Sequence, residues 1–268
     1  MTFRGASAEA FEAASRELGT VVPGAADPAK VGDDLFSVVA VLRSEPGLRR
    51  VVTDVSLPAQ AKSGLVREIL GGKIDDGALS VVVTAVERRW TAARDLADAL
   101  EQLGVVAVVR SADDAGRLAD ELFSFAQLVK ELPELRDALS DPARSIEDKR
   151  TLVRSLLEGK ATPATVRLVE QSLAGTHRTV GVALEEYQRV ASEVHGEGVA
   201  TVHVAHPLSD AELERLGTSL ARQYGRPVHL NVVVSPDVVG GIRVEIGHDV
   251  IDGTVSSRLD EARRKLVG

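Results

Sequence analysis

The fold is decided by a stretch of 41 residues that occurs twice. Residues 33–73 read DDLFSVVAVLRSEPGLRRVVTDVSLPAQAKSGLVREILGGK, and residues 120–160 read DELFSFAQLVKELPELRDALSDPARSIEDKRTLVRSLLEGK. At a fixed offset of 87 positions and without a gap, 15 of the 41 residues are identical. So many identities at one offset indicate an internal duplication, in which each copy is one structural unit.

Apolar spacing predicts that each copy is a bundle of short helices. In the first copy, apolar residues at steps of three and four favour a helix over residues 34–44, which Glu45-Pro46-Gly47 ends. Pro58 is expected to open the next helix, and Gly71-Gly72 to end it. Further helical residues are expected over 76–103.

The second copy carries the corresponding signals. Ser145 is the expected N-cap of its second helix and Gly159 the expected end. Beyond residue 73 the identities fade, but the apolar positions still match. The pairs are Val82 and Val169, Val86 and Leu173, Trp90 and His177, Ala93 and Val180, Ala97 and Leu184, Leu100 and Tyr187, and Leu103 and Val190. Because these positions persist while the residues change, the two copies are expected to share a packing geometry.

Further elements are expected outside the repeated stretch. An amphipathic helix is predicted over residues 7–18, followed by a Gly- and Pro-rich link over 19–28. Residues 104–109, GVVAVV, are expected to form a short strand ahead of a polar helix cap. The same order recurs where residues 198–203 precede Ser209.

After Gly196 the apolar period changes from helical to alternating. Strands are expected over residues 199–205, 228–234 and 239–246. Helices are expected over 209–224 and 254–266, and a turn over 249–253. The predicted fold class is therefore mainly α, with two related helical bundles followed by a small C-terminal α+β domain. The expected boundaries are 1–104, 105–195 and 196–268.

Composition limits the chemistry that the chain can perform. The formal net charge is -8 over 268 residues, which disfavours non-specific binding to nucleic acid. There is no cysteine, so thiolate catalysis and cysteine-ligated metal sites are excluded. No apolar run reaches the roughly 18 residues that a membrane span needs. We expect no catalytic residue, no cofactor and no metal site.

The C-terminal region contains a motif with a family resemblance. Residues 234–259 read VSPDVVGGIRVEIGHDVIDGTVSSRL. A glycine pair, an alternating strand, an Asp-Gly turn and an Arg-Leu pair resemble the delta subunit of bacterial F-type ATP synthases, the counterpart of the mitochondrial oligomycin-sensitivity-conferring subunit. The residues that carry the resemblance are Gly240, Gly241, Asp252, Gly253, Arg258 and Leu259.

The resemblance covers about the last 150 residues directly and reaches the first 104 through the duplication. The chain departs from the family pattern at Ser235, where aspartate is frequent, and at Val166-Arg167-Leu168, where Asn-Phe-Leu is frequent. It is also about one repeat longer than the common form, and in this it is similar to the long delta subunits of high-GC actinobacteria.

The resemblance implies a non-catalytic subunit of the peripheral stalk, which supports proton-driven ATP synthesis. The helical part is then expected to bind N-terminal helices of the alpha subunits, and the C-terminal unit the C-terminal region of the b subunit. Both contacts are helix-in-groove docking. The expected location is the cytoplasmic face of the cell membrane, as a peripheral part of the complex without a span of its own. The six residues named above are expected to shape this unit or contact partners.

Individual residues also have simpler interpretations. Gly240-Gly241 predicts a tight turn or bulge and not a phosphate loop, because no Walker lysine follows and a strand comes next. Asp249 and Asp252-Gly253 predict a turn with a helix cap and not a calcium loop. His203 and His206 point to opposite faces of a strand, which disfavours a metal site.

Three functional alternatives remain open at this level. Trp90 and His177 are expected to be core or boundary residues, with no nucleophile motif nearby. The duplication alone is equally compatible with a free-standing helical-repeat adaptor that scaffolds another complex. An enzyme would need a site assembled from scattered His, Asp and Arg residues, and no spacing supports one. The C-terminal motif favours the stalk subunit.

Overall fold

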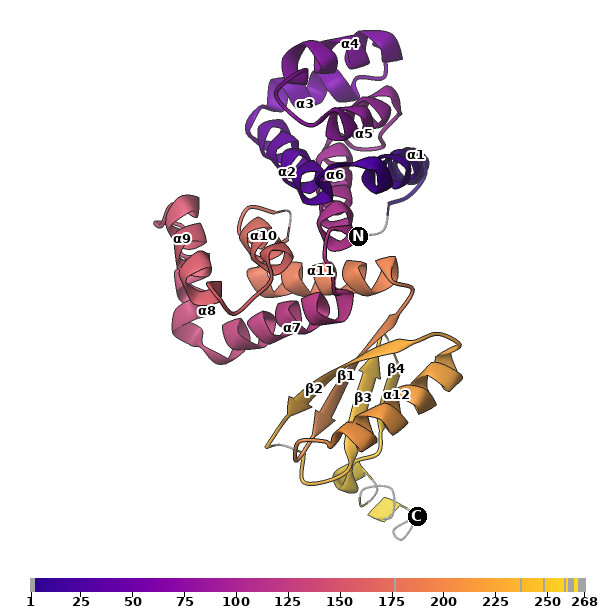
Figure 1. Cartoon of the computed structure of the whole chain (residues 1–268), viewed down its shortest axis with the longest axis vertical. Helices are drawn as coiled ribbons and strands as arrows, with labels where there is room; N and C mark the ends of the chain where they lie inside the picture. The colour runs from indigo at the N-terminus through magenta and orange to yellow at the C-terminus, as the bar shows by residue number, and fades with distance from the viewer. Residues whose placement is uncertain are drawn as a thin grey trace. The chain divides into compact units, whose positions relative to one another are not determined.

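A computed structural model of the chain describes residues 3–175, 177–236, 238–247, 249–257, 259 and 263–264. The chain divides into two compact units, residues 1–191 and 192–268, which are described separately below. The first unit is helical, and the second contains a small sheet (Figure 1). The predicted fold class, mainly α with a small α+β part, is confirmed.

Helices of the first unit recur at the offset seen in the sequence. The first copy, with the helix before it, comprises α1 (Ala6–Val21), the 3-10 turn η1 (Val22–Gly24), α2 (Pro28–Ser44), α3 (Pro46–Thr53), α4 (Ala59–Leu70), α5 (Asp76–Glu87) and α6 (Ala93–Arg110). The second copy comprises α7 (Ala115–Glu131), α8 (Pro133–Ser140), α9 (Ile146–Leu157), α10 (Pro163–Ser172) and α11 (Val180–Val194). The bounds of α7, α8 and α9 are those of α2, α3 and α4 shifted by 87, which confirms the duplication.

Local signals at the helix ends are also repeated. The Asp27 carboxylate accepts the backbone N–H groups of Ala29 and Lys30 at the start of α2, and Asp114 accepts that of Arg117 at the start of α7. Ser145 caps α9 as predicted, accepting the N–H of Asp148 at 3.0 Å. Gly72 and Gly159 follow α4 and α9 with φ of 69° and 67°, a conformation that side chains other than glycine rarely adopt.

Residues 104–109 are helical, and the predicted strand there is wrong. They form the last part of α6, whose residues from Leu96 to Val109 are buried on nearly every side. The helix packs against α1, α2, α3 and α5, and also against α10 of the second copy. A helix enclosed in this way needs apolar residues all round, and a short continuous apolar run cannot be told from a buried strand by periodicity.

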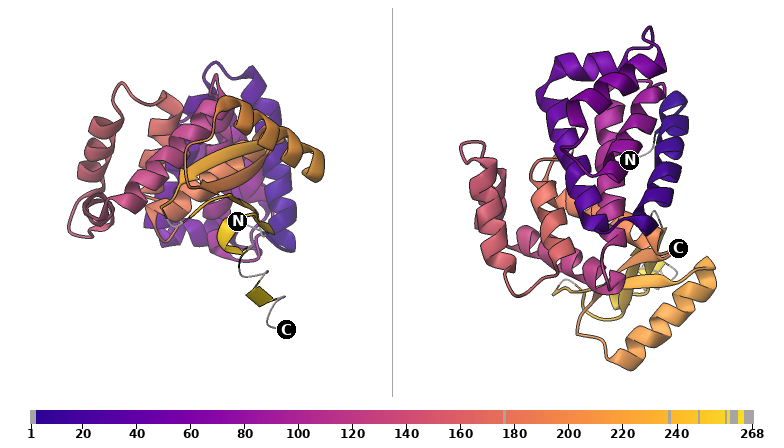
Figure 2. Two further views of the ribbon diagram at one scale, coloured as in Figure 1. Left: turned by 90° about the horizontal axis from the view of Figure 1, so that it is seen from below. Right: turned by 45° about the horizontal axis from the view of Figure 1, so that its top comes forward.

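Two glycines bring α2 and α6 close together. A Cβ atom on Gly32 would lie 3.0 Å from the carbonyl oxygen of Gly104, and one on Gly104 would overlap the Phe36 ring. The two backbones therefore pass closer than larger residues allow (Figures 1 and 2). Trp90 is a core residue, as predicted, and its indole N–H donates to the Ala85 carbonyl at 2.9 Å.

The second unit is a four-stranded sheet with one helix across a face. Its elements are β1 (Gly198–Val204), α12 (Asp210–Tyr224), β2 (Val228–Val234), β3 (Ile242–Ile246) and β4 (Asp249–Asp252). The strand order is β2-β1-β3-β4, with β1 and β2 parallel and the other pairs antiparallel. Leu220 of α12 packs on the apolar face, which includes Ala200, Val202 and Val204 of β1 as predicted.

Two predictions for this unit need correction. Residues 249–252 are strand β4, where a turn was expected; they pair with β3, and all four side chains are exposed. An edge strand exposed on both faces has no apolar alternation to mark it. The third strand begins at Ile242 and not at Val239, because Gly241 has a φ of 84°. The expected last helix is helical at residues 255–257, 259 and 263–264, and its other residues after Ser257 lie outside the described ones.

Candidate partner-binding surfaces

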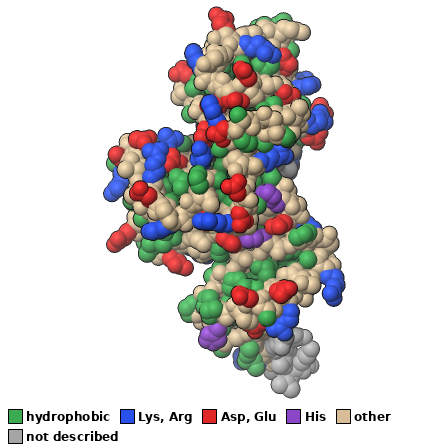
Figure 3. Space-filling model, in the orientation of Figure 1, with side chains coloured by type: hydrophobic (Ala, Val, Ile, Leu, Met, Phe, Trp, Pro, Cys, Tyr) green, Lys and Arg blue, Asp and Glu red, His purple; other side chains and the backbone are tan. Residues whose placement is uncertain are grey.

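Ionisable side chains in the described part of the chain form ion pairs and caps, and none forms a recognisable reactive site. No group of three or more His, Asp or Glu residues there is placed to hold a metal ion. His177 is half-buried, and its ring meets Tyr187 edge-on at 5.7 Å. On the face shown in Figure 3, basic and acidic side chains are interspersed, with apolar patches between them.

A buried polar joint ties the two copies together. The Glu101 carboxylate on α6 is 3% exposed as a residue and accepts hydrogen bonds from Arg43, Gln171 and Tyr187, at 2.6, 3.0 and 3.0 Å. Arg43 lies on α2 of the first copy, whereas Gln171 and Tyr187 lie on α10 and α11 of the second. Arg43 also donates to the carbonyl of Ala174 at 3.2 Å.

Protonation states in this joint are set by burial. Burial raises the pKa of the Tyr187 phenol well above its ordinary value, and the adjacent Glu101 carboxylate raises it further. The phenol therefore stays protonated and donates to Glu101. Sequence reasoning missed the joint; the available signal was an acidic residue, Glu101, between the apolar positions Leu100 and Leu103.

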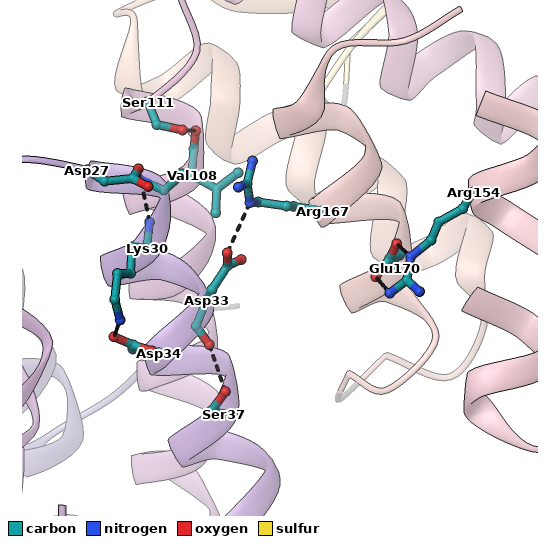
Figure 4. Close-up of polar contacts among 11 residues, drawn as sticks. Asp27, Lys30, Asp33, Asp34, Ser37, Val108, Ser111, Arg154, Arg167 and Glu170 are labelled. Carbon is teal, nitrogen blue, oxygen red and sulfur yellow. Dashed lines mark hydrogen bonds and ion pairs between the residues drawn. The ribbon is translucent and has the colours of Figure 1, made fainter. Parts of the chain in front are cut away.

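A second polar contact is built identically in both copies. In the first copy the Asp34 carboxylate accepts the N–H of Asp75 at 2.7 Å. It also pairs with Lys30 at 2.6 Å (Figure 4). In the second, Glu121 accepts the N–H of Thr162 and pairs with Arg117, both at 2.8 Å. Each residue of the second set is 87 positions after its counterpart. The carboxylate thereby holds the start of α5 or α10 against α2 or α7.

Acid is expected to weaken the Glu121 contact. Burial alone would raise the pKa of this carboxyl, but hydrogen bonds from Thr165, Thr162 and Arg117 outweigh burial and lower it. The contact therefore adds stability above about pH 4.5, the unfolded value, and loses it as the pH falls through the folded pKa. We expect Glu121→Gln to cost about 1.5–3 kcal/mol at pH 7 and to flatten the acid limb of a urea-unfolding profile.

The matched control for this prediction is Asp137→Asn, at a carboxylate 79% exposed. It should leave the profile unchanged. Superimposable profiles for the wild-type protein and Glu121→Gln would contradict the role of this contact.

A cleft of about 500 Å³ lies between the copies, beside α2, α9 and α10. Arg167 crosses it to pair with Asp33 at 3.0 Å, and Arg154 holds Glu170 through two bonds of 2.6 and 2.9 Å (Figure 4). The lining residues are Asp33, Phe36, Ser37, Val39, Ala40, Arg150, Arg167, Glu170, Gln171 and Ala174. Their mixed character and ion pairs suit protein contacts, since no nucleophile faces a base there.

An apolar groove, here called the first groove, lies among α2, α3, α4 and α5. It encloses only about 20 Å³, and more than half of its lining consists of buried core side chains. Its lining residues are Val38, Val41, Leu42, Leu48, Val52, Val66, Ile69, Leu70, Val82 and Val86. Val41 is 40% exposed at its edge. Only its rim, at Val41, Leu48, Ile69 and Leu70, is exposed or partly exposed, and an apolar rim suits an apolar side chain of a partner better than a polar small molecule.

The C-terminal motif residues shape the backbone. The Gly240 carbonyl accepts the N–H of Val255, and Gly253 donates to the Ile242 carbonyl, both at 2.9 Å. A Cβ on Gly241 would overlap the carbonyl oxygen of Gly253 and lie 2.9 Å from the Thr254 Cα. The backbone bends at Gly240 and Gly241, and this close backbone approach is the reason that position 241 requires glycine.

Asp252 forms the expected turn, whereas the residue that caps the following helix is Thr254. The Asp252 carboxylate accepts the hydroxyl and N–H of Thr254 at 2.7 and 2.9 Å, and the Thr254 hydroxyl in turn accepts the N–H of Ser257. Hydrogen bonds from Thr254 hold the pKa of Asp252 below its ordinary value. Leu259 is 64% exposed, and Arg258 lies outside the described residues.

Comparison with known proteins decides the family. A family model described as ATP synthase delta (OSCP) subunit matches residues 104–266, which is more than half of the chain. The chain belongs to the ATP synthase delta (OSCP) subunit family. It is accordingly a peripheral-stalk component of an F-type ATP synthase, and a structural, not a catalytic, subunit.

Relatives from actinobacteria align over nearly the whole chain, and each is called ATP synthase subunit delta. The protein from a Nocardioides species is 56% identical, covering 100% of this chain and 98% of its own. The protein from Kineococcus radiotolerans is 47% identical, and the alignment covers 91% of this chain and 90% of its own. The protein from Thermobifida fusca is 40% identical, and the alignment covers 99% of this chain and 100% of its own. The family match starts at residue 104, so the first copy lies outside it, although these relatives span that copy too.

Among solved structures, a chain in the cryo-EM structure of the Toxoplasma gondii mitochondrial ATP synthase hexamer is similar. It has a TM-score of 0.37 and 18% identity, over 62% of this chain and 95% of that one. In the described part of this delta-family chain, no helix combines the length and apolar character needed to cross a bilayer.

Proposed function

We propose that the chain joins the N-terminal helices of the alpha subunits to the C-terminal region of the b subunit, at the cytoplasmic face of the cell membrane. The helical residues 1–104 and 105–195 hold the catalytic head, and residues 196–268 hold the stalk. The observation that carries this proposal is the apolar rim of the first groove, where Val41 is 40% exposed and Leu48, Ile69 and Leu70 are partly exposed. Such a surface receives the apolar face of a helix.

Resistance to rotary torque follows from several simultaneous contacts. Two modest interfaces on one chain hold far more tightly than either alone, because the second contact forms at a high effective concentration. Within the C-terminal unit, Gly240, Gly241, Asp252 and Gly253 set the backbone path, and we assign Arg258 and Leu259 to the contact with b. The polar joint between the copies serves the same purpose inside the chain.

Site-specific photo-crosslinking in the assembled synthase tests this proposal. A photoreactive residue at Val41 is expected to yield a product with alpha, and one at Leu259 a product with b, identified by mass spectrometry. The unsubstituted chain, irradiated in the same way, is the control. Products with neither subunit from either position, in a complex that still synthesises ATP, would refute the linkage.

A further inference from the structure

One edge of the sheet in the C-terminal unit is unpaired. Strand β2 is the outer strand in the order β2-β1-β3-β4, and within the described residues it pairs with β1 alone (Figure 1). Two bonds at the ends of this pair fix its orientation. The N–H of Gly198 donates to the Pro227 carbonyl, and the N–H of Ser235 donates to the Val204 carbonyl, both at 2.8 Å.

The register of this ladder shows which backbone groups of β2 remain free. In a parallel pair, alternate residues of a strand bond to the partner strand. With both ends fixed as above, His229, Asn231 and Val233 bond to β1. The N–H and C=O groups of the residues between and beside them point outward, and they form no hydrogen bond with any described residue. These outward residues are Val228, Leu230, Val232 and Val234.

The two edges of the sheet differ in how they resist pairing with another strand. Natural proteins protect an edge strand by short length, charged side chains or proline. Strand β4 has four residues, with Asp249 and Asp252 at its ends. Strand β2 has seven residues, VHLNVVV, and contains no Asp, Glu, Lys, Arg or Pro. Its last residue, Val234, is 49% exposed. The β2 edge is therefore suited to accept an additional strand.

A buried polar side chain on β2 also lacks a partner. Asn231 is 2% exposed, and neither its Oδ1 nor its Nδ2 atom forms a hydrogen bond. Its side chain lies on the sheet face opposite α12, because Leu230 and Val232 pack into the cluster on the α12 side. An unpaired buried carboxamide is unfavourable. A polar side chain on a strand beside β2 can supply the missing hydrogen bond.

Basic side chains border the Val228 end of this edge. The Arg226 guanidinium lies 3.3 Å from the place that a Cβ atom on Gly198 would take, and Gly198 is the β1 partner of Val228. Arg222 and Arg226 are exposed, and neither forms an ion pair with any described residue, Glu197 before β1 included. These charges favour an acidic segment as the occupant. A second copy of the chain is disfavoured, because two molecules of net charge -8 repel each other.

We propose that β2 accepts an extended segment of the b subunit as a fifth strand of the sheet. The segment has apolar side chains at every second position, a polar side chain opposite Asn231, and acidic residues near the Val228 end. Its backbone bonds to the four outward residues of β2. The inference rests on the proposed function, in which residues 196–268 hold the C-terminal region of b. It replaces the helix-in-groove contact that the resemblance implies for this unit by main-chain pairing.

Amide hydrogen exchange in the full-length chain, measured by NMR, tests this proposal. Exchange is compared before and after addition of a synthetic peptide from the C-terminal region of b. At the four outward amides of β2, exchange is expected to slow by at least about tenfold. The amides of His229, Asn231 and Val233 already bond to β1 and should change far less. A helix packed on a face of the sheet would not produce this alternation.

Substitutions at Val234 separate main-chain pairing from side-chain contact. Val234→Pro removes one outward N–H and keeps every bond to β1, so calorimetry should show about five- to tenfold weaker peptide binding. Val234→Ala keeps the N–H and should weaken binding by less than about threefold. Unchanged exchange in β1 shows that each variant is folded. If Val234→Pro disturbs the sheet, the exchange pattern of the wild-type chain decides.

The basic border is tested separately. Arg226→Gln should weaken binding several-fold at about 0.05 M salt and make little difference at about 0.5 M. Arg94→Gln is the matched control, since this arginine lies in the helical unit with a side chain 84% exposed. It should leave the affinity unchanged.

The outcomes distinguish this inference from the proposed function. Peptide binding without alternating protection along β2, or with equal losses for Val234→Pro and Val234→Ala, would overturn strand addition and leave the contact with b standing. Absence of any binding to the folded chain would overturn both. Sedimentation showing a dimer that Val234→Pro dissociates and the peptide does not would assign the edge to a second copy and overturn the inference.

Discussion

Arg43→Met is expected to lower the free energy of unfolding of the helical unit by about 3–5 kcal/mol. The substitution removes the cation from the buried Glu101 carboxylate, whose side chain is only 4% exposed, and keeps most of the side-chain volume. A buried carboxylate without its cation bears the cost of desolvation without compensation. Urea unfolding followed by circular dichroism measures the loss.

A second substitution separates charge from packing in this experiment. Adding Glu101→Gln to Arg43→Met removes the uncompensated charge, and the amide can still accept from Gln171 and Tyr187. The double variant should therefore be more stable than Arg43→Met alone. Arg136→Met, at a pair exposed on both sides, should change stability by less than about 1 kcal/mol. Equal losses of unfolding free energy for Arg43→Met and Arg136→Met would show that the buried joint contributes no more to stability than an exposed ion pair.

Gly241→Ala is expected to destabilise the C-terminal unit by about 2–4 kcal/mol, from a positive φ and a steric overlap together. The φ of 84° is unfavourable for alanine, and its Cβ would collide with the backbone at Gly253 and Thr254. Hydrogen exchange over residues 198–252 of the full-length chain should rise, while exchange in the helical unit should not change. Binding to a synthetic peptide from the C-terminal region of b should weaken in parallel.

The control for Gly241 is a glycine that also has a positive φ but has room for an added Cβ atom. Gly247 has a φ of 59°, and an added Cβ would meet no atom within 4 Å. Asparagine tolerates this conformation, so Gly247→Asn should cost less than about 1 kcal/mol. If Gly241→Ala were as mild as Gly247→Asn, the close approach of the two motif segments would not be the reason for the glycine.

Sequence reasoning succeeded where local chemistry determines the structure. Proline begins α3 and α8 and directly precedes α4, glycine follows α4 and α9, and one register of 87 fixes most helix bounds in the second copy. The family motif was also recognisable, and Gly241 has the positive φ and Asp252 the turn hydrogen bond that their residue types favour.

The remaining features depend on tertiary contacts that a single sequence does not show. Residues 104–109 are helical because α6 is buried among helices of the first copy and α10 of the second. Strand β4 forms because its backbone can hydrogen-bond to the edge of β3. The polar joint assembles residues separated by as many as 131 positions, as in the bond from Arg43 to Ala174. The repeat predicts an apolar residue at position 128, but the exposure of Leu128 required the structure.

The central position of α6 bears on how this protein transmits load. One uninterrupted helix of 18 residues is packed into the first copy along its length and also contacts α10 of the second. A hydrogen-bonded rod shared in this way is stiff in bending, unlike a flexible tether between separate bundles. The two copies are therefore expected to move together as one rigid body, so that a lateral force on either copy is transmitted directly to the other.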